Sequence, residues 1–326
     1  MRERPFPCSE VAGQSIRETE TMTDFLLYAA TVALWGSSWI AVKLHLGVVA
    51  PEVSLAYRVG ISAAIMLAFC LATGRRLSFA PRQHAWLVLQ GGLLFGGNYL
   101  LIYHGTLYLT SGLVAVVFSA VVVFNIVFGA LFFGLPIRPR VALGAAVGLA
   151  GIGFVFWHDI VAFDIARDGS KGLLFALAGS MLASLGMLVS GRNQMAGIRV
   201  IEGNALGMTY GTLLVGAWVL ATGIPVTVDP RPVYWGALAF LSLASTVVGF
   251  WTYLTLLGRI GADRAGYTTV MFPIVAIALS VAFEGYRPTG LALVGMGLVL
   301  AGNILILMRR TAKPVATTAA TETQGS

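Results

Sequence analysis

Apolar runs of about 20 residues, separated by short polar segments, repeat along nearly the whole chain. The candidate spans are 24–47, 51–73, 84–106, 110–134, 139–157, 170–192, 202–222, 234–257, 264–284 and 288–308. A helix of about 20 residues crosses a hydrocarbon core of about 30 Å. Runs such as AVVFSAVVVFNIVFGALFF are continuously apolar and lack the alternation of a membrane barrel. The pattern predicts an all-α polytopic membrane protein with ten transmembrane helices, and it places Pro51, Pro139 and Pro288 in first helical turns.

The composition agrees with this prediction. Hydrophobic residues make up 57% of the chain and charged residues only 11%, whereas soluble proteins carry about 25% charged residues. The net charge of +7 could suggest a nucleic-acid partner, but the positions of the basic residues indicate topology. Of 21 Lys and Arg, fifteen fall on one side of the predicted spans and four on the other. We therefore expect both termini in the cytoplasm and no nucleic-acid partner.

The two ends of the chain are polar. Residues 1–23 form a cytoplasmic leader without an apolar core, so a cleaved signal peptide is excluded and the first span acts as an uncleaved anchor. Translation starts at Met1 or at Met22. Residues 310–326 have low complexity and are predicted to be a disordered cytoplasmic tail. Cys8 and Cys70 lie in the leader and in a span, so we expect no structural disulfide.

The chain contains an internal repeat. Three segments of the first half match three of the second in the same order, and the matches pair Ser37 with Ser184, Gly97 with Gly249, Tyr99 with Trp251, Gly148 with Gly297 and Gly153 with Gly302. The predicted units are a first five-helix repeat at 24–157 and a second at 158–309. Because five is odd, the second copy crosses the membrane upside down. Inverted repeats are typical of secondary transporters with a substrate site between the halves.

Two basic residues lie inside predicted spans. Arg58 is about 10 Å along a helix from Pro51, where an arginine is costly unless it faces a wet cavity or a partner. It either attracts a substrate carboxylate or makes a structural bond to helix-end carbonyls or to Glu52 or Glu284. Lys43 is closer to the outer end, where a lysine that extends to the membrane surface is ordinary.

Aromatic and amide side chains provide the other site candidates. Trp35, Trp39 and Lys43 share one helical face, which suits a cavity better than lipid. The Asn98 amide is costly in hydrocarbon, so it should face other helices or water. The repeat partners Tyr99 and Trp251 are expected to project towards the centre between the two repeats. Rings there can stack on an aromatic substrate or hold an ammonium; the alternative is helix packing. The predicted cavity lining is Trp39, Asn98, Tyr99, Trp251 and Tyr267, with Arg58 and Lys43 favouring carboxylates.

Further positions have more ordinary explanations. Tyr103 and His104 fit an aromatic belt at the membrane surface, and Ser119 and Asn125 are weaker candidates. Pro273 should kink the ninth helix, and its repeat partner near Val121 is not proline, so a symmetric pair of broken helices is not expected.

Glycines at every fourth position provide a packing signal. Gly203, Gly207 and Gly211 form a small-residue face of the kind that allows close helix packing.

Motifs for soluble chemistry are absent. The sequence has no GxSxG, HExxH, CxxC, P-loop or GxGxxG, and it has no paired carboxylates within a span. We therefore expect no enzyme, no catalytic residue, no metal and no cofactor, and transport would draw on a gradient. Lys43, His104 and Glu284 are the titratable candidates for a proton relay.

Several of these segments resemble a known family. LWGSSWIAV, AYRVGISAAIM, YHGTLYLTSGLVAVVFS and MFPIVAIALSVAFEG are similar to the EamA type of the drug/metabolite transporter superfamily, over residues 24–308. The resemblance implies two inverted five-helix repeats, export of small metabolites, and an arginine at the position of Arg58 whatever the substrate. The nearest subgroup is the YddG type, bacterial exporters of aromatic and other neutral amino acids. One departure is FFGLPIR, which lacks the acidic residue seen in the second half as Glu284.

The expected function follows from these points. The chain should bind a small molecule and the lipid bilayer, exporting small neutral or aromatic amino acids, or related metabolites, by alternating access. The alternative is a multidrug or nucleotide-sugar-like carrier on the same fold. A polytopic enzyme or a channel or receptor belongs to other classes, and no catalytic cluster supports the enzyme.

Overall fold

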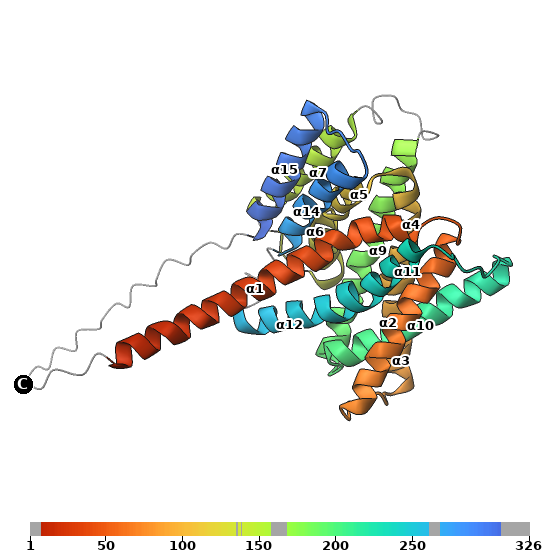
Figure 1. Ribbon diagram of the computed structural model, residues 1–326, viewed down its shortest axis with the longest axis horizontal. Helices are drawn as coiled ribbons and strands as arrows, with labels where there is room; N and C mark the ends of the chain where they lie inside the picture. The colour runs from red at the N-terminus through yellow and green to blue at the C-terminus, as the bar shows by residue number, and fades with distance from the viewer. Residues whose placement is uncertain (1–7, 135, 138, 158–167, 261–267, 308–326) are drawn as a thin grey trace, which may run out of the picture.

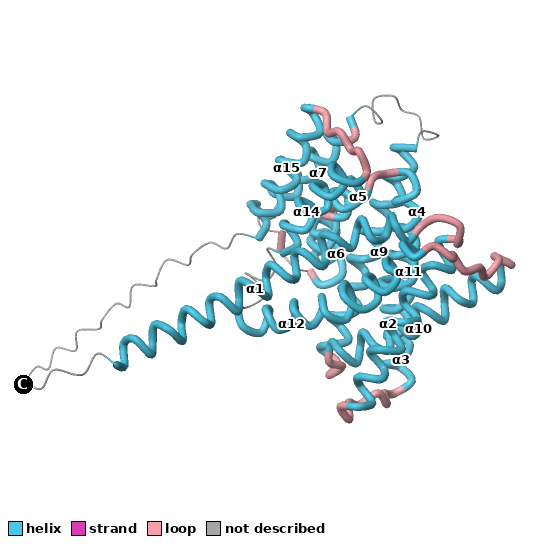
Figure 2. Tube along the Cα trace, in the orientation of Figure 1, coloured by secondary structure: helices cyan, strands magenta, loops and turns pink. Residues whose placement is uncertain are grey.

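A computed structural model describes residues 8–134, 136–137, 139–157, 168–260 and 268–307 of the chain (Figure 1). Within these ranges the chain forms helices joined by loops, as Figure 2 shows. The helices are α1 (Cys8–His45), α2 (Pro51–Ala72), α3 (Pro81–Gln90), η1 (Gly91–Gly97), α4 (Asn98–Tyr108), α5 (Ser111–Phe118), α6 (Val121–Phe133), α7 (Pro139–Val155), α9 (Asp168–Met195), α10 (Val200–Thr222), α11 (Pro232–Ala239), η2 (Phe240–Val248), α12 (Gly249–Ile260), α14 (Thr268–Phe283) and α15 (Gly290–Leu307).

These elements make the ten predicted spans. Seven helical stretches are long and apolar enough to cross a membrane, and three shorter apolar helices, α7, α14 and α15, complete the set. The third span consists of α3, η1 and α4, the fourth of α5 and α6, and the eighth of α11, η2 and α12. The prediction of an all-helical polytopic protein with ten helices is confirmed.

Two ends of helices differ from the expectation. The first helix begins at Cys8 and so runs through most of the predicted leader, extending away from the other helices (Figure 1). The last helix begins at Gly290 rather than at Pro288. Here the Thr289 side chain accepts a hydrogen bond from the Ala292 N–H, 3.2 Å away. Thr289 therefore caps the helix and leaves the proline outside the first turn.

The third and eighth spans are interrupted at corresponding places by π-helical segments. In the first half the segment is η1, and in the second half it is η2. The repeat partners Gly97 and Gly249 lie at the ends of these two segments, because Gly97 closes η1 and Gly249 follows η2. A π-helix bonds each N–H five residues back instead of four, and such segments are frequent at functional sites. The halves therefore share a pair of π-helical segments, at a place where proline gave no signal, and the helix continues through both.

The fourth and ninth spans differ from the prediction that Pro273 kinks the ninth span and that the fourth span is regular. The chain continues as one helix, α14, through Pro273. Its counterpart without proline is divided into α5 and α6 at Ser119 and Ala120. There the N–H groups of Ser119 and Ala120 bond three residues back, to Val116 and Val117, as in a tight 3₁₀ turn. The two halves are unlike here, as expected, but the half without proline contains the interruption.

Glycines allow the helices to approach one another at backbone distance. A Cβ atom on Gly151 of α7 would lie 2.6 Å from the Gly295 carbonyl of α15, so the fifth and tenth spans touch through their backbones. Gly211 of α10 approaches the Gly91 carbonyl of η1, where a Cβ would lie 3.0 Å away. The prediction that the α10 glycines permit close packing is confirmed for this position. Van der Waals contact of this kind drives helix association in lipid.

Buried side chains from both halves form the main core. Its members come from α1, α2, η1, α4, α10 and η2, and the largest include Phe95, Tyr103 and Leu241. A second core lies around α5, α7, α9 and α15. The two halves are therefore packed against each other rather than joined only by a linker, and the first core surrounds the candidate site.

The approach of η1 to α10 provides a test of this packing. A Cβ on Gly91 would lie 2.4 Å from the Gly207 carbonyl and 2.9 Å from the Gly211 nitrogen, both backbone atoms. We expect Gly91→Ala to lower the free energy of unfolding by about 1–3 kcal/mol, as overpacking does. Thermal unfolding of the purified protein in detergent measures the effect.

The matched control is Gly216→Ala on α10, where an added Cβ meets nothing within 4 Å. Alanine favours a helix over glycine by about 1 kcal/mol, so this variant should be at least as stable as the parent. Equal stability of the Gly91→Ala variant and the parent would contradict the close contact.

Candidate functional site

A narrow crevice between the two halves contains Arg58. It holds about 160 Å³ of empty space, without room for a water molecule, and is lined by Arg58, Val59, Ser62, Phe95, Tyr99, Met208 and Thr246. Phe95 belongs to η1 and Thr246 to η2. Both π segments therefore contribute to the same site.

The Arg58 guanidinium lies against aromatic rings. Its Cζ is 4.6 Å from the centroid of the Tyr99 ring and 6.0 Å from that of Tyr103, and the residue is only 7% exposed. Among the described residues, its Nε has no hydrogen-bond partner. A desolvated cation on a tyrosine face gains about 2 kcal/mol, and a guanidinium is suited to bind a carboxylate through two parallel bonds.

The two acids considered as structural partners of Arg58 are bound elsewhere. Glu52 lies 3.0 Å from His104 Nε2. Glu284 accepts hydrogen bonds from the Ser111 N–H, at 3.0 and 3.1 Å to its two oxygens, and from the hydroxyls of Ser111 and Ser280. The expectation of a bond from Arg58 to either acid is therefore wrong.

Tyr103 is fully buried, so its assignment to a surface belt is wrong. Its hydroxyl lies 3.0 Å from His45 Nδ1, and the His45 ring lies 4.4 Å from that of Tyr234 of the second half. The Tyr234 hydroxyl in turn lies 3.0 Å from Ser54 Oγ. A polar chain thus runs from Arg58 to α11.

Sequence reasoning missed His45. The side chain is fully buried, and its Nε2 has no partner among the described residues. A histidine at the end of an apolar run ordinarily reaches the membrane surface, so the local sequence gave no signal. The burial comes from Tyr234, which belongs to the other half of the chain.

The face of α1 with two tryptophans points into the protein. Trp35 Nε1 donates to the Ser245 carbonyl of η2 at 3.1 Å. The Trp39 ring lies between Phe118 of α5, at 5.2 Å, and Phe272 of α14, at 6.1 Å between ring centroids. Trp39 is therefore held between both halves, close to the break in the fourth span.

Lys43 is bound inside the protein and does not extend to the membrane surface. Its Nζ donates to the carbonyls of Thr106, at 2.6 Å, and Leu109, at 3.4 Å. These carbonyls lie at the C-terminus of α4, where the last four carbonyls of a helix lack intrahelical partners and the helix dipole attracts a cation. Lys43 therefore caps α4, and the expectation that it extends to the membrane surface is wrong.

Asn98 is buried, which confirms that it does not face lipid. Its Nδ2 donates to the Leu94 carbonyl of η1 at 3.1 Å, and its Oδ1 has no partner among the described residues. The amide therefore satisfies a carbonyl of the π segment and keeps one acceptor for another donor.

Trp251 does not join the crevice. The side chain is 64% exposed, while the next residue, Thr252, accepts a hydrogen bond from the Thr31 hydroxyl of α1 at 3.0 Å. Because successive helical residues point about 100° apart, Thr252 faces α1 and Trp251 faces outward. The expectation that Tyr99 and Trp251 project equivalently is wrong, and Tyr267 lies outside the described residues.

The weaker candidates take part in helix packing. The Asn125 side chain accepts a hydrogen bond from the Ser184 hydroxyl at 2.7 Å, and Ser119 donates to the Ala115 carbonyl at 3.3 Å. Within the described ranges no group of three His, Cys, Asp or Glu side chains could hold a metal ion.

An ion pair lies in the loop before α11, at the end of the molecule opposite the basic loops, and its arginine also contacts the first half. Arg231 donates to both oxygens of Asp229, at 2.5–3.0 Å, and to the Leu46 carbonyl of the first half at 3.5 Å. The Arg231 guanidinium holds the pKa of the Asp229 carboxyl below its ordinary value. The Arg231 bond to Leu46 and the apolar cluster of Val49, Val53 and Tyr234 join the two halves on this face.

Comparison with known proteins gives one family. The EamA-like transporter family matches residues 22–157 and 170–308, once in each half. An uncharacterized inner membrane transporter, YedA of Escherichia coli (strain K12), is 25% identical over 297 residues, which cover 89% of this chain and 94% of that protein. A probable amino-acid metabolite efflux pump of the same strain is 23% identical, covering 86% and 93%.

A solved crystal structure has the same fold. It aligns with a TM-score of 0.60 and 22% identity, covering 87% of this chain and 96% of the other. The two family matches agree with a duplicated architecture of two five-helix halves.

The Asp229–Arg231 pair predicts a pH dependence. A carboxyl whose pKa is lowered on folding contributes stability that is present above its unfolded pKa of about 3.9 and is lost as the pH falls through the folded value. The unfolding temperature of the parent should therefore exceed that of Asp229→Asn at neutral pH, and the difference should shrink below about pH 4.

Asp168→Asn is the matched control. This carboxylate is 76% exposed and lies 3.8 Å from Lys171, so its removal should change the unfolding temperature little at any pH. A difference between parent and Asp229→Asn that stays constant down to pH 3 would contradict the ion pair.

Proposed function

This chain belongs to the EamA-like transporter family, and from that premise we propose that it exports small neutral or aromatic amino acids, or related metabolites, as a secondary transporter. Members of the family are membrane transporters, so the chain is a transporter and not an enzyme. We place it in a bacterial inner membrane, as the name of the relative YedA suggests, with both termini in the cytoplasm on the basis of the basic loops.

The observation that carries the proposal is the Arg58 guanidinium in the crevice. Arginine inside a membrane marks a substrate path or a structural pair, and no carboxylate among the described residues neutralises this one. A substrate carboxylate would supply the missing negative charge. The Tyr99 ring beside the guanidinium would stack on an aromatic substrate.

Amino-acid substrates also gain support from a relative. The similar protein of Escherichia coli is named a probable amino-acid metabolite efflux pump. A cation in the crevice disfavours cationic drugs by like-charge repulsion. A nucleotide sugar carries phosphates that a guanidinium could bind, and this carrier class remains the second candidate.

Alternating access fits the closed crevice. In the described conformation the crevice has no room for a water molecule, so substrate binding requires the halves to move apart around Arg58. Two π segments at equivalent positions border the site, and π segments are frequent at functional sites. We propose that these segments hinge the movement.

Counterflow in proteoliposomes tests the proposal. Vesicles loaded with one unlabelled amino acid should accumulate the labelled form, and a panel of amino acids, a cationic dye and a nucleotide sugar identifies the substrate class. Repeating the assay at two pH gradients reports proton coupling. Counterflow of the nucleotide sugar alone would replace our assignment with the second candidate, and no counterflow of any solute would reject a carrier of these classes.

Variants of the crevice locate the site. Arg58→Gln should reduce counterflow more than about tenfold, because a charged hydrogen bond to a carboxylate is lost, and Tyr99→Ala should reduce it for aromatic substrates more than for alanine. Trp218→Ala, which removes a tryptophan that is 55% exposed on α10, is the control. Trp251→Ala tests whether this exposed tryptophan contacts the substrate once the halves have moved apart. Parental counterflow would leave Trp251 as a surface residue, and reduced counterflow would place it in the site.

Unchanged counterflow in Arg58→Gln, with parental expression and unfolding temperature, would remove Arg58 from the site. A reduction of counterflow in Arg58→Gln that is no larger than the reduction in Trp218→Ala would indicate a general effect on membrane insertion.

A further inference from the structure

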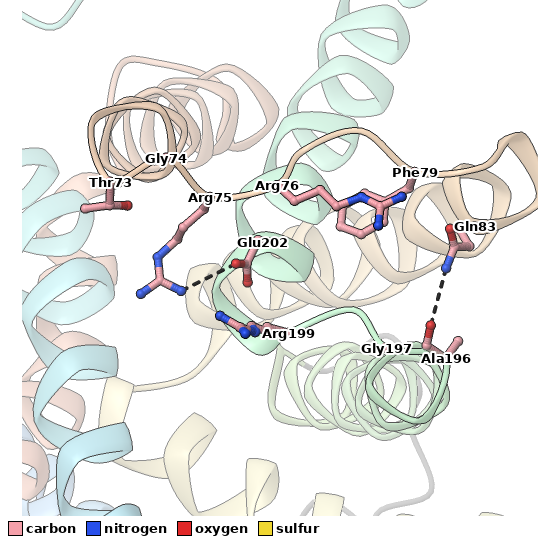
Figure 3. Close-up of a pocket in the computed structure, with 10 residues that line it drawn as sticks. All are labelled: Thr73, Gly74, Arg75, Arg76, Phe79, Gln83, Ala196, Gly197, Arg199 and Glu202. Atoms are coloured by element: carbon pink, nitrogen blue, oxygen red, sulfur yellow. Dashed lines mark hydrogen bonds and ion pairs between the residues drawn. The ribbon is translucent and has the colours of Figure 1, made fainter.

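A second pocket, larger than the crevice, opens on the opposite face from the Asp229–Arg231 pair. It has a volume of about 670 Å³ and lies between the loop that follows α2 and the loop that joins α9 to α10 (Figure 3). This volume is within the range of about 300–1,000 Å³ that small-molecule sites occupy. The pocket lies at the ends of α2 and α9 and at the start of α10, and helices that cross a bilayer end in its head-group region.

The two loops are shaped by glycines with left-handed backbone conformations. Gly74 has φ +63° and Gly197 has φ +84°, which other residues rarely adopt. Each ends a helix: the Arg75 N–H returns to the Cys70 carbonyl of α2, and the Ile198 N–H to the Asn193 carbonyl of α9. The sharp turns leave the next side chains beside the pocket.

Contacts between the halves hold the pocket at two places. The Gln83 Nε2 donates to the Ala196 carbonyl at 3.3 Å, and Arg75 lies 3.4 Å from the Glu202 carboxylate. Figure 3 shows both contacts as dashed lines, on opposite sides of the pocket. The pocket therefore has walls from both halves of the chain.

Glu202 has one oxygen without a partner. Its side chain is 5% exposed, and Oε2 accepts no hydrogen bond from any described residue. A buried carboxylate oxygen without a donor is costly, so this oxygen favours a ligand or water that can donate to it. An ammonium group is the charged donor that suits it.

Three guanidiniums line the same pocket as this single carboxylate. They belong to Arg75, Arg76 and Arg199. Arg76 is fixed in place, because its Nε donates to the Ser78 carbonyl at 2.8 Å and its Cζ lies 5.7 Å from the Phe79 ring. Arg199 precedes α10, whose first turn has no side-chain cap and attracts anions. The excess positive charge favours an anionic group.

We propose that this pocket binds a zwitterionic head group, with its ammonium on Glu202 and its phosphate or carboxylate on Arg76 and Arg199. The chemistry is shared by an amine-bearing phospholipid and a free amino acid. The lipid alternative is independent of the transport function, and the amino-acid alternative rests on it, as a loading site separate from Arg58.

Lipid binding is tested on the full chain in detergent by native mass spectrometry. The probes are phosphatidylethanolamine, phosphatidylcholine, whose quaternary ammonium has no N–H donor, and phosphatidylglycerol, which has no ammonium. We expect phosphatidylethanolamine to be retained about tenfold better than either, the change that one charged hydrogen bond produces.

Two variants separate the charges. Glu202→Gln should remove the preference for phosphatidylethanolamine over phosphatidylcholine, and Arg76→Ala with Arg199→Ala should weaken both lipids. The second variant leaves the Arg75–Glu202 pair intact, so it remains informative if Glu202→Gln does not fold. Arg82→Ala, which removes an exposed cation near the pocket, should behave as the parent.

The amino-acid alternative is tested by binding of labelled leucine and phenylalanine to Arg58→Gln in phosphatidylcholine nanodiscs. Binding that survives there and is lost on adding Glu202→Gln supports a second amino-acid site. The absence of both the lipid preference and this binding would overturn the proposal and leave a water-filled pocket. Parental counterflow would show that the transport function stands regardless.

Discussion

The structure depends on one constraint: backbone polar groups at membrane depth must find partners within the protein. Regular α-helices meet this requirement, but among the described residues the third, fourth and eighth spans depart from regular α-helix. At each π segment a side chain donates to a carbonyl, from the same span at η1 and from α1 at η2. Asn98 donates to Leu94 of η1, and Trp35 donates to Ser245 of η2. The polar residues inside the spans are explained first by these interruptions.

The same constraint explains two charges near the turn between α4 and α5. Lys43 donates to carbonyls at the C-terminus of α4, and Glu284 accepts from the Ser111 N–H at the N-terminus of α5. Each charge has the sign that complements the dipole of its helix end. Lys43 comes from the first half and Glu284 from the second, so the turn is held from both. Glu284 is therefore engaged in holding this turn, through the Ser111 N–H and the hydroxyls of Ser111 and Ser280.

The spans could be predicted from the sequence because apolar length is a local property. Pro51 begins α2 and Pro139 begins α7, as expected. The π segments could not be predicted, since an apolar run has the same composition in either helix type. They also explain why the repeat misled the placement of Trp251. Because η2 has nine residues and η1 has seven, a match by sequence offset alone does not fix the direction in which the residues after each segment face.

The local sequence also could not predict all of the residues that are buried in the site. Arg58 and Asn98 stood out because polar groups are costly in hydrocarbon, and both are buried. His45 and Tyr103 are fixed by Tyr234, and only the folded chain brings these residues together. Arg58, Tyr103, His45 and Tyr234 thus lie in contact one after another inside an apolar core, joined by ring contacts and by the bond between His45 and Tyr103.

The contacts that join the halves differ between the two faces. On the face of Asp229 and Arg231, a buried apolar cluster lies beneath the ion pair. On the other face, Arg75 and Glu202 meet at 3.4 Å with the Arg75 side chain 27% exposed, so solvent screens the attraction between them. Burial of apolar surface is worth more, about 25 cal/mol per Å². The ion pair of the basic face is therefore a weaker contact than the apolar cluster of the other face, whereas deeper on the basic side the halves stay joined by the close approach of Gly91 to Gly211.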